Sequence, residues 1–541
     1  MPSSLAILGR AMADPDMRRL QLASASWSAG EAAYLVGLFV FAYVANGPGG
    51  VAIVAVIRTV PSVIFAPTMA ALASDRSVDR SIRWTLGVRL VTVAALAGAL
   101  IVGWPIVVVY ALAGMDSVAA TFLRPLRNAI LPGIARSPEE LVAGNVALTT
   151  GDSLANLVGP ALAAAALVVM GTVGAFAPGL LLLAIALAAS AGLHTARPLR
   201  ASRPATAGPV VRPGRLDPVR WLVRSPAVFV VGMFTVQRLV RGGLTVLLVA
   251  AAVDLLGMGE PGVGVLTAAI GLGGLLGGGL AVGLVGRSRL APWFALGIGM
   301  WGLGVAVVGV IPVAGVALAA LAAGGVGKVL IDVAGYSLLQ RSIPNDLRTS
   351  VLGIQEGLVT AALAVGSVAA TILIDVVGIG PAMAVAGAAP VAVAVLAWPA
   401  LRRVDGASVV PERDLALLRG VPMFEPLQLA TIEELASGME RRVVAAGEVI
   451  VRQGEPGDRF YLIDTGEVAV EIDGQAGSPL RAGDSFGEIA LIRDVPRTAT
   501  VTALTQVDLA AIERTRFLEA VTGHRHSAAA ADRIVSERLG S

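Results

Sequence analysis

Charged side chains interrupt the long apolar stretches between residues 20 and 401, and these charges are the first candidates for chemistry. An ionisable group is costly in a hydrocarbon environment, so each one there is a functional candidate by default. The charges within these stretches are Glu31, Arg58, Arg89, Asp116, Asp152, Arg238, Arg241, Lys328, Asp332, Glu356 and Asp375.

Glu31 is the strongest candidate for proton chemistry among them, with Arg58 on the next apolar stretch. A low dielectric favours the neutral carboxyl, which would let a proton gradient load and unload Glu31. A purely structural Glu31–Arg58 pair is the alternative, and the sequence leaves both open. Lys328 and Asp332 lie four residues apart on one helix face, so we expect them to pair.

Several other kinds of chemistry are excluded by residue type. The chain has no cysteine, and its three histidines are His194, His524 and His526. Disulfides are impossible and no credible zinc site can be built from these residues. No kinase or cyclase motif is present either. We therefore predict a protein that is not an enzyme, with no catalytic residue, resident cofactor or metal.

The elements that must hold the charges are membrane helices. Hydrophobic residues make up 56% of the chain, charged residues only 15%, and the mean hydropathy is +0.79; a globular domain has about 25% charged residues. Apolar windows of about 20 residues, enough to cross a ~30 Å hydrocarbon core, recur along the chain. The twelve expected spans are 20–45, 49–73, 82–103, 105–128, 141–170, 173–194, 226–253, 261–286, 290–311, 314–342, 347–376 and 380–401.

Loop charges predict which side of the membrane each connection faces. Arginines gather in alternate connections, whereas those around 46–50, 103–105, 171–178, 255–261, 311–315 and 377–381 carry no Lys or Arg. The positive-inside rule then places both termini and the Arg/Pro-rich loop 195–225 in the cytoplasm of a multi-pass protein of the inner (plasma) membrane. Six plus six helices is the layout of a transporter built from repeats, although the count alone also fits a channel or receptor.

Two local patterns carry a more specific signal. The second-to-third connection reads Ala66-Pro67, Leu72-Ala73-Ser74-Asp75-Arg76 and Asp79-Arg80, and Pro125-Leu126-Arg127-Asn128-Ala129 follows the fourth span. Together with Leu339-Gln340-Arg341 through Arg348, these residues resemble the major facilitator superfamily, in its enterobactin-exporter-like and multidrug-exporter-like branch. Ser74 is extra relative to the usual spacing, and Ser81 stands where a final Arg is common.

The resemblance covers residues 20–401 and implies alternating access around a central cavity, with a gate motif of Asp75, Arg76 and Arg80. Asp116, Arg124 and Arg127 are then expected to be scaffolding near this gate. The transport or coupling candidates are Glu31, Arg58, Asp116, Asp152, Lys328, Asp332 and Glu356. The segment 155–164, with Gly159-Pro160, resembles the fifth-helix motif of exporters and favours export, ordinary small-residue packing being the alternative.

The chain changes character after residue 404. Residues 1–404 carry a net charge of +11 and residues 405–541 carry −8. Short alternating runs separated by glycines, such as 447–451 and 465–472, indicate a small β-barrel or jelly roll with flanking helices. Within it, Phe486-Gly487-Glu488-Ile489-Ala490-Leu491 and Pro496-Arg497-Thr498-Ala499-Thr500-Val501 resemble the phosphate-binding cassette of the cyclic nucleotide-binding domain, over residues 412–538.

This resemblance implies a role for each cassette residue. Gly487 would let the backbone N–H groups of a short helix approach a cyclic phosphate, and Arg497 would bind its oxygens. Glu488 would accept from the ribose 2′-hydroxyl, and Thr498 would donate to the phosphate. The remaining ligand contacts would come from Phe486, Ile489, Ala490 and Ala499, from Val470 and Leu480 against the base, and from Ile534 or Arg538 on a closing final helix.

The ligand would be cAMP or cGMP, and a composition rich in Ala, Gly, Arg and Val, typical of GC-rich bacterial genomes, favours cAMP. A degenerate cassette kept only for packing is the alternative. The acidic tail carries no clustered cations for a phosphate backbone, so no nucleic acid partner is expected. The partners would be the nucleotide, the bilayer, an unidentified small substrate and, if transport is coupled to a proton gradient, protons.

The sequence thus predicts an all-α twelve-helix bundle followed by a cytoplasmic β domain. Its expected parts are an N-terminal segment 1–19, half-bundles 20–194 and 226–403, the loop 195–225, a tether 404–411 and a nucleotide-binding domain 412–541. The predicted function is secondary transport, as an exporter regulated by cyclic nucleotide. A non-transporting sensor, an exporter of the nucleotide itself, and a ligand-indifferent assembly module remain as rivals.

Overall fold

The structure is a computed structural model of the chain, and it divides into two compact units, residues 1–408 and 409–541. It describes residues 14–74, 78–134, 138–193, 217–284, 289–343, 345–408, 412–427, 431–432, 435–436, 438–522 and 525–540. The side chains of some helical residues, 62–74 and 537–540 among them, lie outside this description.

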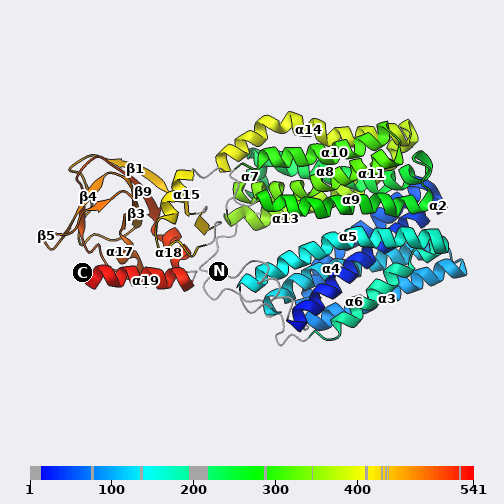
Figure 1. Cartoon of the computed structure of the whole chain (residues 1–541), viewed down its shortest axis with the longest axis horizontal. Coiled ribbons are helices and arrows are strands. Elements are labelled where there is room, and N and C mark those ends of the chain that lie inside the picture. Colours follow the sequence, from blue (N-terminus) through cyan, green and yellow to red (C-terminus); the bar gives the residue numbers. More distant parts are fainter. Residues whose placement is uncertain are drawn as a thin grey trace. The chain divides into compact units, whose positions relative to one another are not determined.

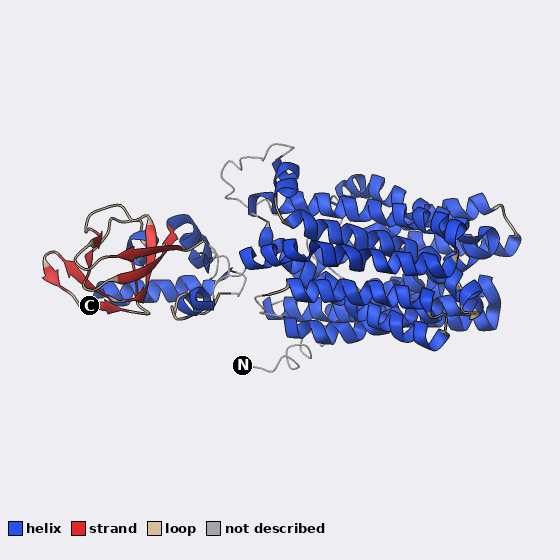
Figure 2. Cartoon of the chain, turned by 90° about the horizontal axis from the view of Figure 1, so that it is seen from above, coloured by secondary structure: helices blue, strands red, loops and turns tan. Residues whose placement is uncertain are grey.

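The described part of the first unit is entirely helical (Figures 1 and 2). Its first group, blue to cyan in Figure 1, comprises α2 (Pro15–Ser74), α3 (Val78–Val102), α4 (Ile106–Ile134), α5 (Pro138–Gly174) and α6 (Ala177–Ser190). Helix α2 is interrupted at Asn46 and Gly47, whose backbone angles are not helical; Gly47 has φ +60°. The segment therefore consists of two helices, one before and one after this break.

The second group follows in green and yellow. It comprises α7 (Asp217–Arg224), α8 (Ala227–Ala250), η1 (Ala251–Leu255), α9 (Gly259–Ala281), η2 (Val282–Leu284), α10 (Ala291–Val310), α11 (Ala314–Leu330), η3 (Ile331–Gly335), α12 (Tyr336–Ser342), α13 (Asn345–Val377) and α14 (Ile379–Ser408). The elements η1 and η3 are π-helical turns that continue α8 and α11.

Ten of the described helices are long and apolar enough to cross a membrane, against the twelve that the sequence predicted. The difference has two causes. The first two expected spans fall within α2 and are counted as one helix, Pro15–Pro61. The expected span 173–194 is only the 14-residue helix Ala177–Ser190, because the chain turns at Gly171 (φ +68°) before it begins.

Two expected connections also contain helix. Part of the loop 195–225 forms α7, whose Leu222 is buried at 5% exposure. Helix α14 continues through Ser408 into the expected tether, and the Asp405 carboxylate accepts a hydrogen bond from the Leu290 amide at 2.8 Å. Packing onto the bundle therefore orders residues that composition alone marks as linkers.

Glycines bring the helices of this unit close together. A Cβ on Gly242 of α8 would lie 2.0 Å from the Leu363 carbonyl oxygen of α13, and one on Gly366 would lie 1.8 Å from that of Leu239. Such close backbone approach is typical of membrane helix packing, where small residues replace the hydrophobic drive.

The described strands of the chain all lie in the second unit (Figure 2). The first antiparallel sheet has the order β1-β9-β3-β7 and the second β2-β8-β4-β5, with β6 also paired to β4. The strands are β1 (Glu440–Val444), β2 (Val449–Val451), β3 (Arg459–Thr465), β4 (Glu467–Ile472), β5 (Gln475–Ala476), β6 (Leu480–Arg481), β7 (Ser485–Phe486), β8 (Thr500–Ala503) and β9 (Val507–Glu513). The β domain predicted from the alternating runs is present.

Four described helices flank the sheets: α15 (Glu412–Arg419), α17 (Glu488–Ile492), α18 (Arg514–Thr522) and α19 (Arg525–Gly540). The unit has two apolar cores. One lies between the strands and includes Ile463, Val468 and Leu509. The other joins the helices to β3 and β9 through the rings of Phe424, Phe460 and Phe517, which contact one another at centroid distances of 4.7–6.1 Å.

Candidate functional site

The centre of the cassette is a tight turn between β7 and α17. Gly487 has φ +93°, a left-handed conformation that L side chains rarely adopt. A Cβ at this position would lie 2.4 Å from Nη1 of Arg497 and 3.0 Å from the carbonyl oxygen of Arg459. Glycine is therefore required for the backbone path and for the guanidinium beside it. The turn leaves the first N–H groups of α17 without helical acceptors.

Arg497 is buried beside this turn, with 5% of its surface exposed. Its Nη1 donates to the Gly487 carbonyl at 3.2 Å and its Nη2 to the Arg459 carbonyl at 2.8 Å. The Asp458 carboxylate lies 3.4 Å from Nη2 but keeps 73% of its side chain exposed. Carbonyl dipoles and one solvated carboxylate hold the guanidinium in place while leaving most of its positive charge for an incoming anion.

An aromatic pair supports the same guanidinium. The ring of Tyr461 lies 5.6 Å from the Arg497 guanidinium carbon and stacks on Phe486 at 5.0 Å and 14°. The pairing of β3 with β7 places Tyr461 opposite Phe486, which explains the stack. Burial raises the pKa of the Tyr461 hydroxyl, so the ring stays neutral next to the cation.

The other predicted cassette residues gather around α17. Glu488 is the first residue of the helix and is 1% exposed, and Ala490 is also buried. Ile489, Thr498 and Ala499 are half-buried. Two backbone hydrogen bonds, from the Gly454 amide to the Arg497 carbonyl and from the Arg497 amide to the Glu455 carbonyl, fix the second half of the cassette to the loop before β3.

The residues assigned to the base divide between the two cores. Val470 and Leu480 are half-buried against the core between the sheets. Ile534 instead packs against the core formed by the helices and Phe460, so the structure does not bring it to Val470 and Leu480. The Arg538 side chain lies outside the described residues. Helix α19 contacts α17, and Arg493 lies 3.7 Å from Asp532.

Three residues around Arg497 were missed by reading the sequence: Asp458, Arg459 and Tyr461. They lie 36–39 positions before Arg497, and no local motif marks them. The available signal was the alternating pattern of 459–465, which predicts a strand but does not say which strand it pairs with.

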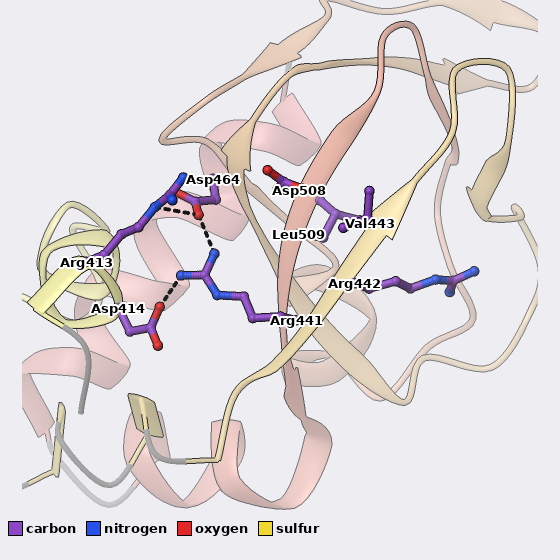
Figure 3. Close-up of a pocket in the computed structure, with 8 residues that line it drawn as sticks. All are labelled: Arg413, Asp414, Arg441, Arg442, Val443, Asp464, Asp508 and Leu509. Carbon is purple, nitrogen blue, oxygen red and sulfur yellow. Dashed lines mark hydrogen bonds and ion pairs between the residues drawn. The ribbon is translucent and has the colours of Figure 1, made fainter. Parts of the chain in front are cut away.

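The second unit has two cavities that do not include Gly487 in their lining. One, of about 390 Å³, is shown in Figure 3, where Arg441 reaches between Asp414 and Asp464, and Arg413 also contacts Asp464. These carboxylates raise the pKa of Arg441, so its charge is permanent and already balanced. The other, of about 490 Å³, has Asp458 and Arg459 in its lining, and Arg459 is paired there with Glu440. Neither cavity includes Arg497 or Glu488.

The charged residues within the long apolar helices form separate clusters. Glu31 contacts Arg58 at 3.1 Å and Arg89 at 2.9 Å, and Asp116 contacts the same two arginines at 3.3 and 2.9 Å. Asp116 therefore belongs to the same cluster as Glu31, on helix α4, which packs against α2 and α3. Its expected role as scaffolding near the gate motif stays a prediction, because Asp75 and Arg76 lie outside the described residues. Because two guanidiniums contact its carboxylate, Glu31 fits the alternative of a structural Glu–Arg pair better than the hypothesis of a carboxylate that takes up and releases protons.

The remaining candidates are placed as follows. Asp152 accepts from Arg127 at 2.9 Å and from Ser28 at 2.8 Å, so Arg127 links α4 to α5. Lys328 and Asp332 form the expected pair at 2.8 Å, and Glu356 is exposed on α13. Of the gate motif, Asp75 and Arg76 lie outside the described residues, and Arg80 is exposed on α3.

Comparison with known proteins bears on the second unit. The sequence model of the family described as cyclic nucleotide-binding domain matches residues 441–524. A cAMP-dependent protein kinase regulatory subunit of Yarrowia lipolytica is 39% identical over 102 residues, 18% of this chain and 27% of that protein. A cyclic nucleotide-gated potassium channel of Mesorhizobium japonicum is 40% identical over 105 residues, 19% of this chain and 29% of that protein.

Among solved structures, the regulatory domain of Toxoplasma gondii PKA with cAMP matches with a TM-score of 0.23 and 25% identity, over 26% of this chain and 56% of that one. The chain spans less than a third of the length of the two curated relatives. The chain carries a C-terminal cyclic nucleotide-binding domain, behind a helical region that is compatible with a membrane domain.

Proposed function

We propose that the chain is a secondary active transporter of the major facilitator type that exports a small molecule and is regulated by cAMP. The buried, carbonyl-held Arg497 is the observation that carries the regulatory part, because it presents a positive charge where the cassette resemblance expects a cyclic phosphate. The name of the Yarrowia lipolytica relative favours cAMP over cGMP.

The transporter part is supported by the packing of the two helix groups. If α2 is divided at its break, α11, η3 and α12 are counted as one helix and the eight-residue α7 is left out, each group contributes six helices. Helices α9 and α13 are then the second and fifth of the second group. Helix α5, fifth of the first group, packs against α9, and the second part of α2 packs against α13, where Thr371 donates to the Pro48 carbonyl at 3.5 Å. Each second helix thus meets a fifth helix, which is the reciprocal contact expected of two related repeats.

The exporter-like segment also contributes to this contact. A Cβ on Gly264 of α9 would lie 2.5 Å from the Pro160 carbonyl oxygen, and one on Gly271 would lie 2.4 Å from that of Asn156. Within the segment 155–164, the backbone of α5 therefore lies directly against α9. If one helix group rocks against the other during transport, this contact is where the two groups would hinge or a gate would open.

Nucleotide binding is tested on the full chain in lipid nanodiscs by calorimetric titration with cAMP and cGMP. We expect cAMP to bind more tightly than cGMP, and Arg497→Ala to weaken binding by roughly 1.5–3 kcal/mol or more, the value of a hydrogen bond to a charged group. Arg481→Ala, which removes a 75%-exposed arginine of the same domain, is the matched control. Equal binding by both variants would refute the role of Arg497, and no binding by the parent would recast the domain as an assembly module.

Transport is tested in proteoliposomes with a proton gradient and a panel of dyes, with and without cAMP. We expect gradient-dependent movement of at least one dye, at a rate that changes when cAMP is present on the domain side. Radiolabelled cAMP as the moved species would establish the nucleotide exporter instead. If no dye of the panel is moved while cAMP still binds, the result would favour the non-transporting sensor.

A further inference from the structure

The second helix group contains more positive than negative charge at one place. Lys328 of α11 contacts Asp332 at 2.8 Å, and Arg238 of α8 contacts it at 3.5 Å. Arg241, one turn along α8 from Arg238, is close enough to interact with the charge of Asp332, and its guanidinium makes no ion pair or hydrogen bond with any residue that the structure describes. Two cations therefore contact a single carboxylate, and a third lies near them.

This cluster, defined as Arg238, Arg241, Lys328 and Asp332, is open to a solute. The Lys328 and Asp332 side chains keep 29% and 31% of their surface exposed, and Arg241 is exposed although it lies within a long apolar helix. Arg124, on α4 of the first helix group, is also exposed and repels Arg241. Positive charge from both groups thus acts on the same accessible space.

Two further features indicate an incomplete polar site. The Nε of Arg238 is buried and has no hydrogen-bond partner among the described residues. Such atoms are rare in folded proteins and call for a missing partner. Asp332 lies in the π-helical turn η3, which interrupts the regular helix between α11 and α12. Turns of this kind occur mostly as local bulges at functional sites.

We propose that Arg238, Arg241 and Lys328 bind the anionic group of the transported molecule, so that the substrate is a small organic anion bearing a carboxylate, phosphate or sulfonate. The inference rests on the proposed transport function and names its substrate class. Asp332 holds Arg238 and Lys328 in position and neutralises one of the three positive charges. The substrate anion neutralises a second. Arginine forks bind such planar or tetrahedral oxyanions with two hydrogen bonds at once.

The full chain in phosphatidylcholine nanodiscs is titrated with fluorescein, an anionic dye, and with rhodamine 6G, a cationic dye of related shape, by fluorescence anisotropy. We expect fluorescein to bind more tightly in the parent. Arg241→Gln and Lys328→Gln should each weaken fluorescein binding about tenfold, which corresponds to ~1.4 kcal/mol. Asp332→Asn removes the single negative charge and should strengthen it. Arg289→Gln, which removes an exposed arginine outside the cluster, should change neither dye.

The proposal is overturned if rhodamine 6G binds the parent as tightly as fluorescein, if the parent binds neither dye, or if Arg241→Gln and Asp332→Asn change fluorescein binding in the same direction. Fluorescein binding should persist in nanodiscs that contain phosphatidylglycerol. Displacement by that lipid would assign the cluster to a headgroup and overturn the substrate inference.

Flux separates this inference from the proposed function on which it rests. Proteoliposomes that move rhodamine 6G but do not bind fluorescein would keep the transporter and remove the anion site. Charge-dependent fluorescein binding without flux of either dye would keep the anion site and remove the transporter.

Discussion

Two buried arginines, one in each unit, show how a charge is held for structure and how it is held for a ligand. Arg89 in α3 is fully buried and contacts two carboxylates, Glu31 and Asp116, each at 2.9 Å. Arg497 in the cassette is 5% exposed, but its close acceptors are the carbonyls of Gly487 and Arg459. The charge of the first is cancelled within the fold, whereas that of the second is oriented without being cancelled.

The comparison extends to the two helix groups of the first unit. In the first group, Arg58 and Arg89 face Glu31 and Asp116, so that two cations meet two carboxylates. In the second, Arg238 and Lys328 both contact Asp332, and Arg241 lies near them without an ion pair to any described residue. A balanced cluster contributes to helix packing and leaves nothing for a solute. An unbalanced cluster at an accessible position keeps a net positive charge that an anion from outside can neutralise.

The largest effect is expected from breaking the balanced arginine. Arg89→Met leaves the buried Asp116 with only its longer contact to Arg58, and loss of one partner from a buried pair destabilises a fold by about 3–5 kcal/mol. The measurement is thermal unfolding of the full chain in detergent. The double variant Arg89→Met/Asp116→Leu, which removes both charges, should recover most of the loss.

Arg83→Met is the matched control for this experiment. Arg83 lies on the same helix and pairs with Asp79 at 2.8 Å, but its side chain is 34% exposed. Exposed pairs contribute about 0–1 kcal/mol. If Arg89→Met lowers stability no more than Arg83→Met does, the distinction between the two kinds of arginine is wrong for the first unit.

The second prediction concerns the turn that orients Arg497. Gly487 and Gly474 both have positive φ, at +93° and +79°, but a Cβ at Gly474 has open space around it. Gly474→Ala should therefore cost only the left-handed backbone term, roughly 1–2 kcal/mol. Gly487→Ala adds contact with the guanidinium and should also weaken cAMP binding more than tenfold, as measured by calorimetric titration.

Stability and binding together decide this prediction. Both variants are unfolded by heat in parallel, so that the backbone penalty common to them can be subtracted. Equal cAMP affinity in the two variants would mean that the position of Arg497 does not depend on the missing Cβ at Gly487.

What could be predicted from the sequence was local. The cassette residues are contiguous, so Gly487, Glu488 and Arg497 could be read as one motif, and the structure gathers them at one turn. Lys328 and Asp332 were paired correctly because helical spacing alone brings positions four apart together. The β domain followed from alternation and glycine spacing.

What could not be predicted depends on long-range packing. Arg89 was seen as a charge, but its partners lie 58 and 27 positions away on α2 and α4. Asp116 was expected near the gate motif, and no local pattern indicated its contacts with Arg58 and Arg89. Ile534 was expected over the base, and no local pattern indicated that the hydrophobic face of α19 packs on Phe460 and its neighbours. A sequence states which residues are apolar or charged, but not which of several compatible surfaces they meet.

The smallest effect is expected from the one carboxylate near Arg497. Asp458 is 73% exposed and lies 3.4 Å from Nη2, so it competes weakly with a bound phosphate for the guanidinium. Asp458→Asn should tighten cAMP binding by up to about fivefold, because an exposed ion pair is worth roughly 0.2–1 kcal/mol. Calorimetric titration measures it, with Glu519→Gln as a control that removes an exposed carboxylate on α18. Weaker binding in Asp458→Asn would show that the carboxylate positions Arg497 for its ligand, and the contrast with the fully neutralised Arg89 would then be one of degree.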